Sequence, residues 1–265
     1  AAYGNHPLGY PILGTETTLS AFNGETLREY MKETYTPDNV VISIAGNIDE
    51  SFIKEVEALF GSYETGFTKP SIQKPVFETG KLARKKNTEQ AHLCIGYNGL
   101  PVGDEDVYNL IVMNNVLGGS MSSRLFQEVR EERGLAYSIY SYHSSFQDNG
   151  MLTIYGGTGA AQLDLLFETV QLTINKLKQE GITEKELKNS KEQIKGSLML
   201  SLESTNSRMS RNGKNELLLK NHRSLDDILE KINGITDKSV NELTHRIFND
   251  QYSLALISPD GELPK

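Results

Sequence analysis

The spacing of apolar positions in the first quarter of the chain predicts two helices on either side of one strand. Apolar residues follow a helical repeat from about residue 25 to 35 and again from about 50 to 60, where they form one stripe that we expect to be buried. Between these helices, apolar and small side chains alternate over residues 40–45, which is typical of a strand. A lone strand leaves its backbone N–H and C=O groups unpaired. The strand therefore needs partners, either in the sheet that follows or on residues outside the chain.

The stretch from residue 65 to 82 shows little periodicity and contains Gly66, Pro70, Pro75 and Gly80. This composition is typical of a linker. The chain is therefore divided into residues 1–64, a linker at 65–82, and a larger part at 83–265.

The pattern over residues 83–265 predicts an α+β fold, in which an antiparallel sheet has helices packed on one face. Two of the predicted strands flank Asn149-Gly150, a strong hairpin signal, and one of the helices opens with the capping box Thr183 and Glu186. The predicted strands are 91–97, 136–146, 151–157 and 252–257. One predicted helix starts near residue 104, and others cover about 122–133, 205–220 and 237–248. Two more lie between these, one that begins near residue 163 and ends at Gly181 and one that opens at Thr183.

Charge and composition exclude several classes of protein. The chain has 27 Lys and Arg against 35 Asp and Glu, a net charge of −8, and no long basic block, which argues against a nucleic-acid partner. No run of about 18 apolar residues is present, so we expect no membrane span. The single cysteine, Cys94, excludes a disulfide scaffold and favours a reducing compartment.

The histidines do not form a metal-binding motif. The closest two of the five, His222 and His245, are 23 positions apart, so no pair can share one helical turn as in H-E-x-x-H or H-x-x-E-H. We therefore expect no metal site in this chain.

Arg130 and Tyr137 are the candidate catalytic residues. Arg130 falls near the end of the predicted 122–133 helix, Gly134 is placed to end that helix in a left-handed conformation, and Tyr137 enters the next strand. Their side chains can therefore converge, and a guanidinium and a phenol are donors suited to a peptide carbonyl or a developing oxyanion. The alternative is that Arg130 pairs with a glutamate of its own helix and that Tyr137 borders the core.

Three segments resemble the insulinase/pitrilysin family of zinc metallopeptidases, most closely the mitochondrial-processing-peptidase branch and its bacterial relatives. The first is the sequence H-P-L-G-Y-P-I-L-G-T at residues 6–15, and the second is Y-T-P-D-N at 35–39 with Gly46-Asn47. The third is S-R-L-x-x-x-x-R-E-x-x-G-L-x-Y at residues 123–137. Together they extend the resemblance over nearly the whole chain.

The resemblance implies a domain order. Residues 1–64 correspond to the C-terminal part of the family's first, zinc-bearing domain, and residues 83–265 correspond to a second, substrate-clamping copy of the same domain type. The family's H-x-x-E-H motif and its distal glutamate ligand are not in this chain. Zinc is therefore expected in the complete enzyme, and this chain alone is expected to bind none and to be inactive.

The resemblance also implies roles for particular residues. Arg130 and Tyr137 match the arginine and tyrosine that reach the substrate backbone and stabilise the tetrahedral intermediate. Gly118, Gly119 and Ser120 are expected to form a substrate-binding loop at the chamber wall, with an ordinary break between helices as the alternative.

The expected function is that of the substrate-binding and transition-state-stabilising portion of a zinc metalloendopeptidase that hydrolyses unfolded or extended peptides. The alternative is a naturally metal-free partner or structural subunit of the same fold. The expected partners are the peptide and a zinc-bearing N-terminal segment or subunit, and a homodimer is compatible with the sequence. The expected location is a bacterial cytoplasm, with an organelle matrix as the alternative.

Overall fold

The computed structural model describes residues 1–62 and 73–265, which divide into two compact units. Unit 1 consists of Ala1–Gly9, Lys74–Lys195 and Leu225–Lys265, and unit 2 consists of Tyr10–Gln73 and Gly196–Ser224. Each unit combines segments that are distant in the sequence. Residues 65–72 of the predicted linker lie outside the described residues, and its last two residues, 81 and 82, belong to a strand of unit 1.

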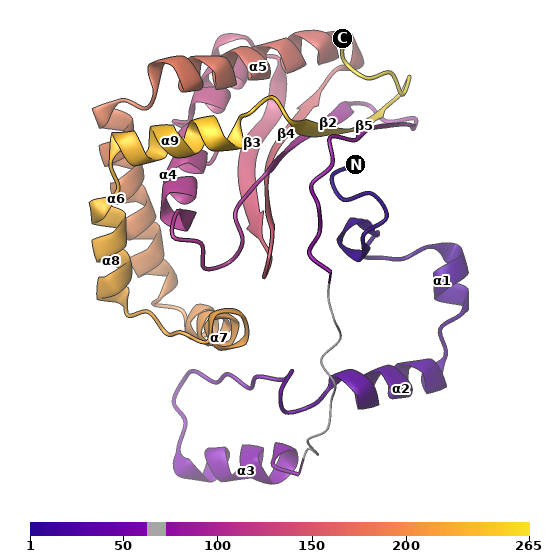
Figure 1. The fold of residues 1–265 in the computed structure, drawn as a ribbon, viewed down its shortest axis with the longest axis vertical. Helices are drawn as coiled ribbons and strands as arrows, with labels where there is room; N and C mark the ends of the chain where they lie inside the picture. Colours follow the sequence, from indigo (N-terminus) through magenta and orange to yellow (C-terminus); the bar gives the residue numbers. More distant parts are fainter. Residues whose placement is uncertain (63–72) are drawn as a thin grey trace. The chain divides into compact units, whose positions relative to one another are not determined.

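Unit 1 contains a five-stranded sheet in the order β1-β5-β2-β4-β3 (Figure 1). The pairs β2–β4, β2–β5 and β3–β4 are antiparallel, as the sequence predicts, whereas β1 runs parallel to β5. The strands are β1 (Lys81–Lys85), β2 (Ala91–Asn98), β3 (Ala136–Ser145), β4 (Gly150–Thr158) and β5 (Tyr252–Ser258).

Strand β1 was not expected from the sequence. Residues 81 and 82 fall in the predicted linker, and the pattern predicts no strand over residues 81–85. All five residues of Lys81–Lys85 are exposed, and the sequence K-L-A-R-K has no apolar alternation that would indicate a strand. The segment is extended because β5 offers a free edge, and charged side chains are common on the outer strand of a sheet.

Helices α4, α5 and α9 pack on one side of the sheet and form the core of unit 1 with it (Figure 1). Leu166, Val170, Ile174 and Leu177 supply the buried stripe of α5, which confirms the helical period predicted there. The helical segments that begin in this unit are η1 (Pro7–Gly9), α4 (Val107–Leu117), the π-helical η2 (Phe126–Glu132), η3 (Ala160–Gln162), α5 (Leu163–Glu180), α6 (Glu184–Ser201), α8 (Leu225–Gly234) and α9 (Asp237–Ile247). The last turns of α6, from Gly196 onward, belong to unit 2.

Helix α8 was not predicted. It buries only Ile228 and Ile232, one turn apart, so its apolar pattern is too short to be distinguished from a loop.

Unit 2 contains α1 (Glu16–Ser20), α2 (Gly24–Thr34), α3 (Glu50–Phe60), α7 (Thr205–Lys214) and the π-helical η4 (Asn215–Leu219). Helices α2 and α3 match the predicted positions, and Asp49 caps α3 by accepting a 3.0 Å hydrogen bond from the backbone N–H of Phe52. The stripe that was expected to be buried is exposed, however, because no residue of α3 is buried and Leu59 remains 64% accessible.

The strand predicted over residues 40–45 is not formed. The segment has no ladder partner among the described residues and does not join the five-stranded sheet. Ser43 Oγ of this segment donates a hydrogen bond to the backbone oxygen of Met209 at 2.7 Å. The prediction failed because a strand exists only where another strand satisfies its backbone.

Within the described part of the chain, no helix is both long enough and apolar enough to cross a bilayer.

Candidate functional site

Arg130 lies in η2, whose end is shaped by Gly134. Gly134 has a φ of +60°, its N–H donates to the carbonyl of Arg130 at 3.2 Å, and the N–H of Leu135 donates to the carbonyl of Val129 at 2.9 Å. This pair of bonds closes a helix with a left-handed residue, as the sequence predicts. The chain therefore reverses immediately after Arg130 and enters β3.

Tyr137 lies at an irregularity in β3 that sets the direction of its side chain. Ala136 pairs with Thr158 and Ser138 pairs with the adjacent Gly157, so Tyr137 is an extra residue in the ladder. Ala136 and Ile139 are both buried although they are an odd number of positions apart, which a regular strand would not permit. The bulge therefore turns Tyr137 away from the core, where the side chain is 74% accessible.

The two candidate catalytic side chains are in contact. The Arg130 guanidinium carbon lies 4.3 Å from the centroid of the Tyr137 ring and 4.8 Å from that of the Phe126 ring. A guanidinium stacked on aromatic faces keeps its N–H groups free at its perimeter. The site therefore presents a fixed cation and a phenol, both able to donate to one oxygen atom.

The alternative partner of Arg130 is also present. Glu131 Oε1 lies 3.7 Å from Arg130 Nε, and the two side chains are 33% and 52% accessible for Arg130 and Glu131 respectively. This separation is too long for a hydrogen bond, and exposed ion pairs contribute little. The guanidinium is thus in contact both with Glu131 and with the Tyr137 and Phe126 rings.

Gly118, Gly119 and Ser120 follow α4 and lie against the outer edge of β3. The carbonyl of Gly118 accepts a 3.0 Å hydrogen bond from the N–H of Ser141, and a Cβ on Gly118 would stand 2.6 Å from that nitrogen. Ser141 is four residues along β3 from Tyr137, roughly 13 Å at the usual rise of a strand. The loop and Tyr137 therefore lie along the same strand, β3, but at separate positions on it.

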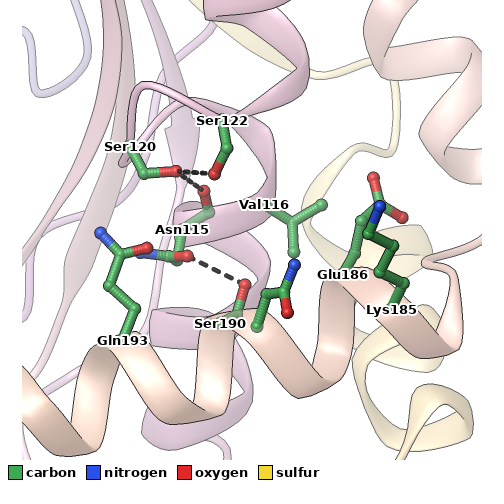
Figure 2. A pocket seen from close by; sticks show the side chains of 9 residues that line it. Asn115, Val116, Ser120, Ser122, Lys185, Glu186, Ser190 and Gln193 are labelled. Atoms are coloured by element: carbon green, nitrogen blue, oxygen red, sulfur yellow. Dashed lines mark hydrogen bonds between the residues drawn. The ribbon is translucent and has the colours of Figure 1, made fainter.

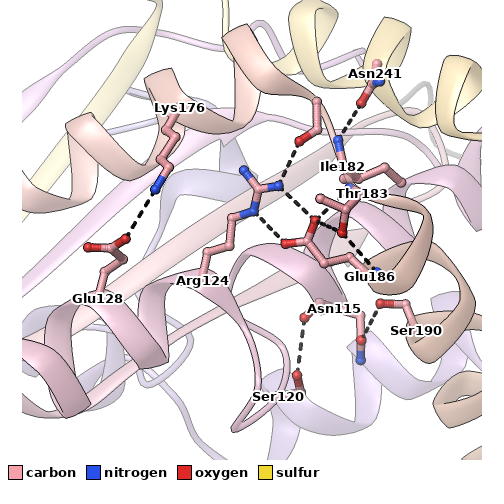
Figure 3. A network of polar contacts seen from close by, with 11 residues as sticks. Asn115, Ser120, Arg124, Glu128, Lys176, Ile182, Thr183, Glu186, Ser190 and Asn241 are labelled. Carbon is pink, nitrogen blue, oxygen red and sulfur yellow. Dashed lines mark hydrogen bonds and ion pairs between the residues drawn. The ribbon is translucent and has the colours of Figure 1, made fainter.

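Arg124, six residues before the stacked arginine, anchors the start of the η2 segment to α6 (Figure 3). Its Nε and Nη2 donate to the two carboxylate oxygens of Glu186 at 2.7 and 2.8 Å, and Nη2 also donates to the carbonyl of Gly181 at 2.7 Å. Thr183 and Glu186 form the predicted capping box, with reciprocal bonds of 2.7 and 3.2 Å. The ion pair is only 14% accessible at Arg124 and 28% at Glu186.

The environment of Glu186 makes the stability of the protein depend on pH. Burial raises the pKa of this carboxyl, but hydrogen bonds from Arg124 and Thr183, with the charge of Arg124, outweigh burial and hold the pKa below the ordinary value of 4.5. A pKa lower in the folded state than in the unfolded one stabilises the fold above the unfolded value, and this stabilisation disappears as the pH falls through the folded value.

We therefore expect Glu186→Gln to lower the free energy of unfolding most at neutral pH, with the deficit shrinking below about pH 4.5. Urea unfolding of both proteins from about pH 7 down to about pH 3 measures this difference. Glu168→Gln, at an exposed position of α5, serves as the control. Its free energy of unfolding should differ little from that of the wild type at any of these pH values. A constant deficit at every pH would contradict the expectation.

The described residues do not fit a metal centre. No three histidine, cysteine, aspartate or glutamate side chains in residues 1–62 and 73–265 lie close enough together to hold an ion. The guanidinium and the phenol of the Arg130–Tyr137 pair can each donate hydrogen bonds, and the guanidinium also carries a positive charge.

Two parts of this site were not assigned from the sequence. Phe126 stacks on Arg130, and its i,i+4 spacing from Arg130 on the predicted 122–133 helix was the available signal. The contact between Arg124 and Glu186 joins residues 62 positions apart, and nothing in the local pattern indicates it.

Comparison with known proteins gives consistent matches. Residues 21–194 match the family described as the peptidase M16 inactive domain. A Bacillus subtilis (strain 168) protein, described as the uncharacterized zinc protease YmxG, is 66% identical over 264 residues, covering 100% of this chain and 64% of that protein. The chain thus spans less than two thirds of the length of this relative.

Two solved structures share the fold. A peptidase M16 inactive domain from Pseudomonas fluorescens is 24% identical, with a TM-score of 0.88, over 99% of this chain and 64% of that one. A chain of complex III2 from Candida albicans with Inz-5 bound is 22% identical, with a TM-score of 0.84, over 97% of this chain and 64% of that one. At these identities the likeness concerns the fold alone.

Proposed function

Because this chain belongs to the family of the peptidase M16 inactive domain, we propose that it is the substrate-clamping portion of a zinc metalloendopeptidase that acts on extended peptides. In this proposal the Arg130 guanidinium and the Tyr137 hydroxyl donate hydrogen bonds to the oxygen of the scissile peptide group. Both interactions strengthen as that oxygen gains negative charge, so they favour the transition state over the bound substrate.

The observation that carries the proposal is the stacked and accessible pair itself. A cation held at 4.3 Å from the Tyr137 ring and 4.8 Å from the Phe126 ring is positioned before substrate arrives. Preorganised donors stabilise an oxyanion more effectively than flexible ones, because little reorganisation is needed during the reaction. The 74% accessibility of Tyr137 leaves room for a polypeptide.

The proposed partner is a zinc-bearing N-terminal segment or subunit, which would supply the metal and the base that activates water. Unit 2 supports this partner because its apolar side chains are uncovered, among them Phe52, Ile53 and Leu59 of α3. Residues 40–45, predicted as a strand, also lack ladder partners among the described residues. An apolar surface of this kind, in the same unit as a segment with the alternation of a strand, is suited to a partner that adds strands.

A non-catalytic structural subunit is the second candidate function. The fold shared with a chain of the Candida albicans complex III2 structure favours it, since this fold also occurs within a large assembly. The single cysteine supports a cytoplasmic location for either function. A homodimer remains a further prediction.

The proposal is tested by reconstitution. We expect the chain alone not to cleave a fluorogenic unfolded peptide, because the described residues offer no metal site. Co-folding it with the part of the Bacillus subtilis relative outside the aligned region should give cleavage that a chelator abolishes.

Two results would contradict the proposal. Cleavage by the isolated chain at the rate of the assembled pair would remove the need for a zinc-bearing partner. An assembled pair that binds zinc but never cleaves a peptide would instead favour the structural subunit.

A further inference from the structure

A cavity of about 310 Å³ lies in unit 1 between the end of α4, the loop after it and the first half of α6 (Figure 2). We call it the α4–α6 cavity. Its polar lining includes Asn115, Ser120, Ser122, Lys185, Asn189 and Gln193. This volume is at the lower end of the range for ligand pockets, so it suits a small molecule or the end of a chain.

Several of the hydrogen-bond acceptors at this cavity are already occupied. Ser190, which is 4% accessible, donates its hydroxyl to Asn115 Oδ1 at 2.9 Å, and Ser120 Oγ donates to the backbone oxygen of Asn115 at 3.4 Å. The carboxylate of Glu186 receives two bonds from Arg124 and two from Thr183. The carboxylate in the lining is therefore already paired, and the amide oxygens of Asn189 and Gln193 are neutral acceptors that a ligand can still reach.

The donors are in surplus. Because Asn115 Oδ1 is fixed by Ser190, the N–H groups of the same amide remain for another partner, and the amides of Asn189 and Gln193 line the same space. The Lys185 ammonium adds a positive charge, and no ion pair of Lys185 is found in the described chain. The negative charge of Glu186 is balanced by Arg124, which leaves the cavity with one uncompensated positive charge.

We propose that the α4–α6 cavity binds a carboxylate, and specifically the C-terminal carboxylate of a peptide. Amide N–H groups, hydroxyls and one ammonium are the donors that a carboxylate accepts from, and one negative charge matches one lysine. A phosphate dianion would bring a second charge close to Glu186 without a second cation. The assignment of this carboxylate to a peptide rests on the proposed function, whereas the proposal that the cavity binds a carboxylate does not.

Calorimetric titration of the full chain with trialanine and with trialanine amide tests the proposal. The two probes differ only in the terminal negative charge, so we expect the amide to bind about 10-fold more weakly, the effect of one charge-assisted hydrogen bond. Lys185→Gln should weaken binding of the acid by a similar factor and leave binding of the amide unchanged. Lys188→Gln is the matched control, since Lys188 is exposed on the same helix outside the cavity lining.

Acetate and inorganic phosphate complete the experiment. If acetate binds as tightly as trialanine, the cavity binds small free carboxylates. That result would overturn the proposal that its ligand is the C-terminus of a peptide. Tighter binding of phosphate than of either carboxylate would overturn the proposal, as would equal binding of trialanine and its amide. These titrations need no zinc-bearing partner, so their failure is distinguishable from failure of the reconstituted peptidase.

Discussion

Arg130→Ala is expected to lower kcat/KM of the reconstituted peptidase about 100-fold. The guanidinium is the only group of the stacked pair that carries a full charge, and it is held between the Phe126 and Tyr137 rings. Its removal takes away a donor that is already in place when the oxyanion develops. Because the loss concerns the transition state, we expect kcat to fall more than KM rises.

Tyr137→Phe separates the hydroxyl from the ring. The phenyl ring can still stack on Arg130, so the guanidinium should keep its position while the second donor is lost. A similar decrease of about 100-fold in kcat/KM is expected if the hydroxyl contacts the oxyanion. Steady-state kinetics on one fluorogenic peptide measures both variants.

Arg133→Ala is the control for these substitutions, because Arg133 is an exposed arginine three positions from Arg130. Its kcat/KM should stay near that of the wild type. The zinc content of the assembled enzyme should be the same in all variants, because no described residue of this chain forms a metal site. Wild-type activity of both Arg130→Ala and Tyr137→Phe would remove the catalytic role from this pair.

Arg124→Ala is expected to lower the free energy of unfolding by about 2–3 kcal/mol. The substitution leaves the Glu186 carboxylate, 28% accessible, without its cation, and it removes the bond to the carbonyl of Gly181. Denaturant unfolding measures the loss, and Arg124→Ala combined with Glu186→Gln should cost less than the sum of the two single changes.

The pair between Arg246 and Asp106 provides the control for this prediction. Arg246 Nη2 lies 2.9 Å from Asp106 Oδ2, but the side chain of Arg246 is 53% accessible and that of Asp106 is 36% accessible. We expect Arg246→Ala to cost less than about 1 kcal/mol, because solvent screens an exposed pair. If Arg124→Ala and Arg246→Ala lower the free energy of unfolding equally, the contacts of Arg124 stabilise the protein no more than an exposed ion pair does.

Local features of the fold were predictable because their physical causes lie within a few residues. The stripe of α5, the capping box of Thr183 and Glu186, and the left-handed Gly134 each depend on contacts inside one helix or its end. The segment around Asn149 also forms the expected hairpin between β3 and β4. In each case the backbone geometry follows from side chains that are neighbours in the sequence.

Pairing between distant segments was not predictable in the same way. Strand β1 is charged and exposed, and it is a strand only because β5 offers an edge. The apolar alternation of residues 40–45 indicates a strand, yet the described chain supplies no edge for it to pair with. A strand is a property of two segments, so one segment is not sufficient evidence for it.

The sequence by itself determined the helical periods, the helix caps, the hairpin and the choice of Arg130 and Tyr137 as candidates. Only the tertiary structure decided that a bulge in β3 turns Tyr137 outward, that the Phe126 and Tyr137 rings hold the guanidinium, and that Ser190 fixes Asn115 from 75 positions away. Short-range order follows from local sterics and hydrogen bonds. The direction of a side chain at a bulge, and the donors that converge on a cavity, depend on packing between segments that only the folded chain brings together.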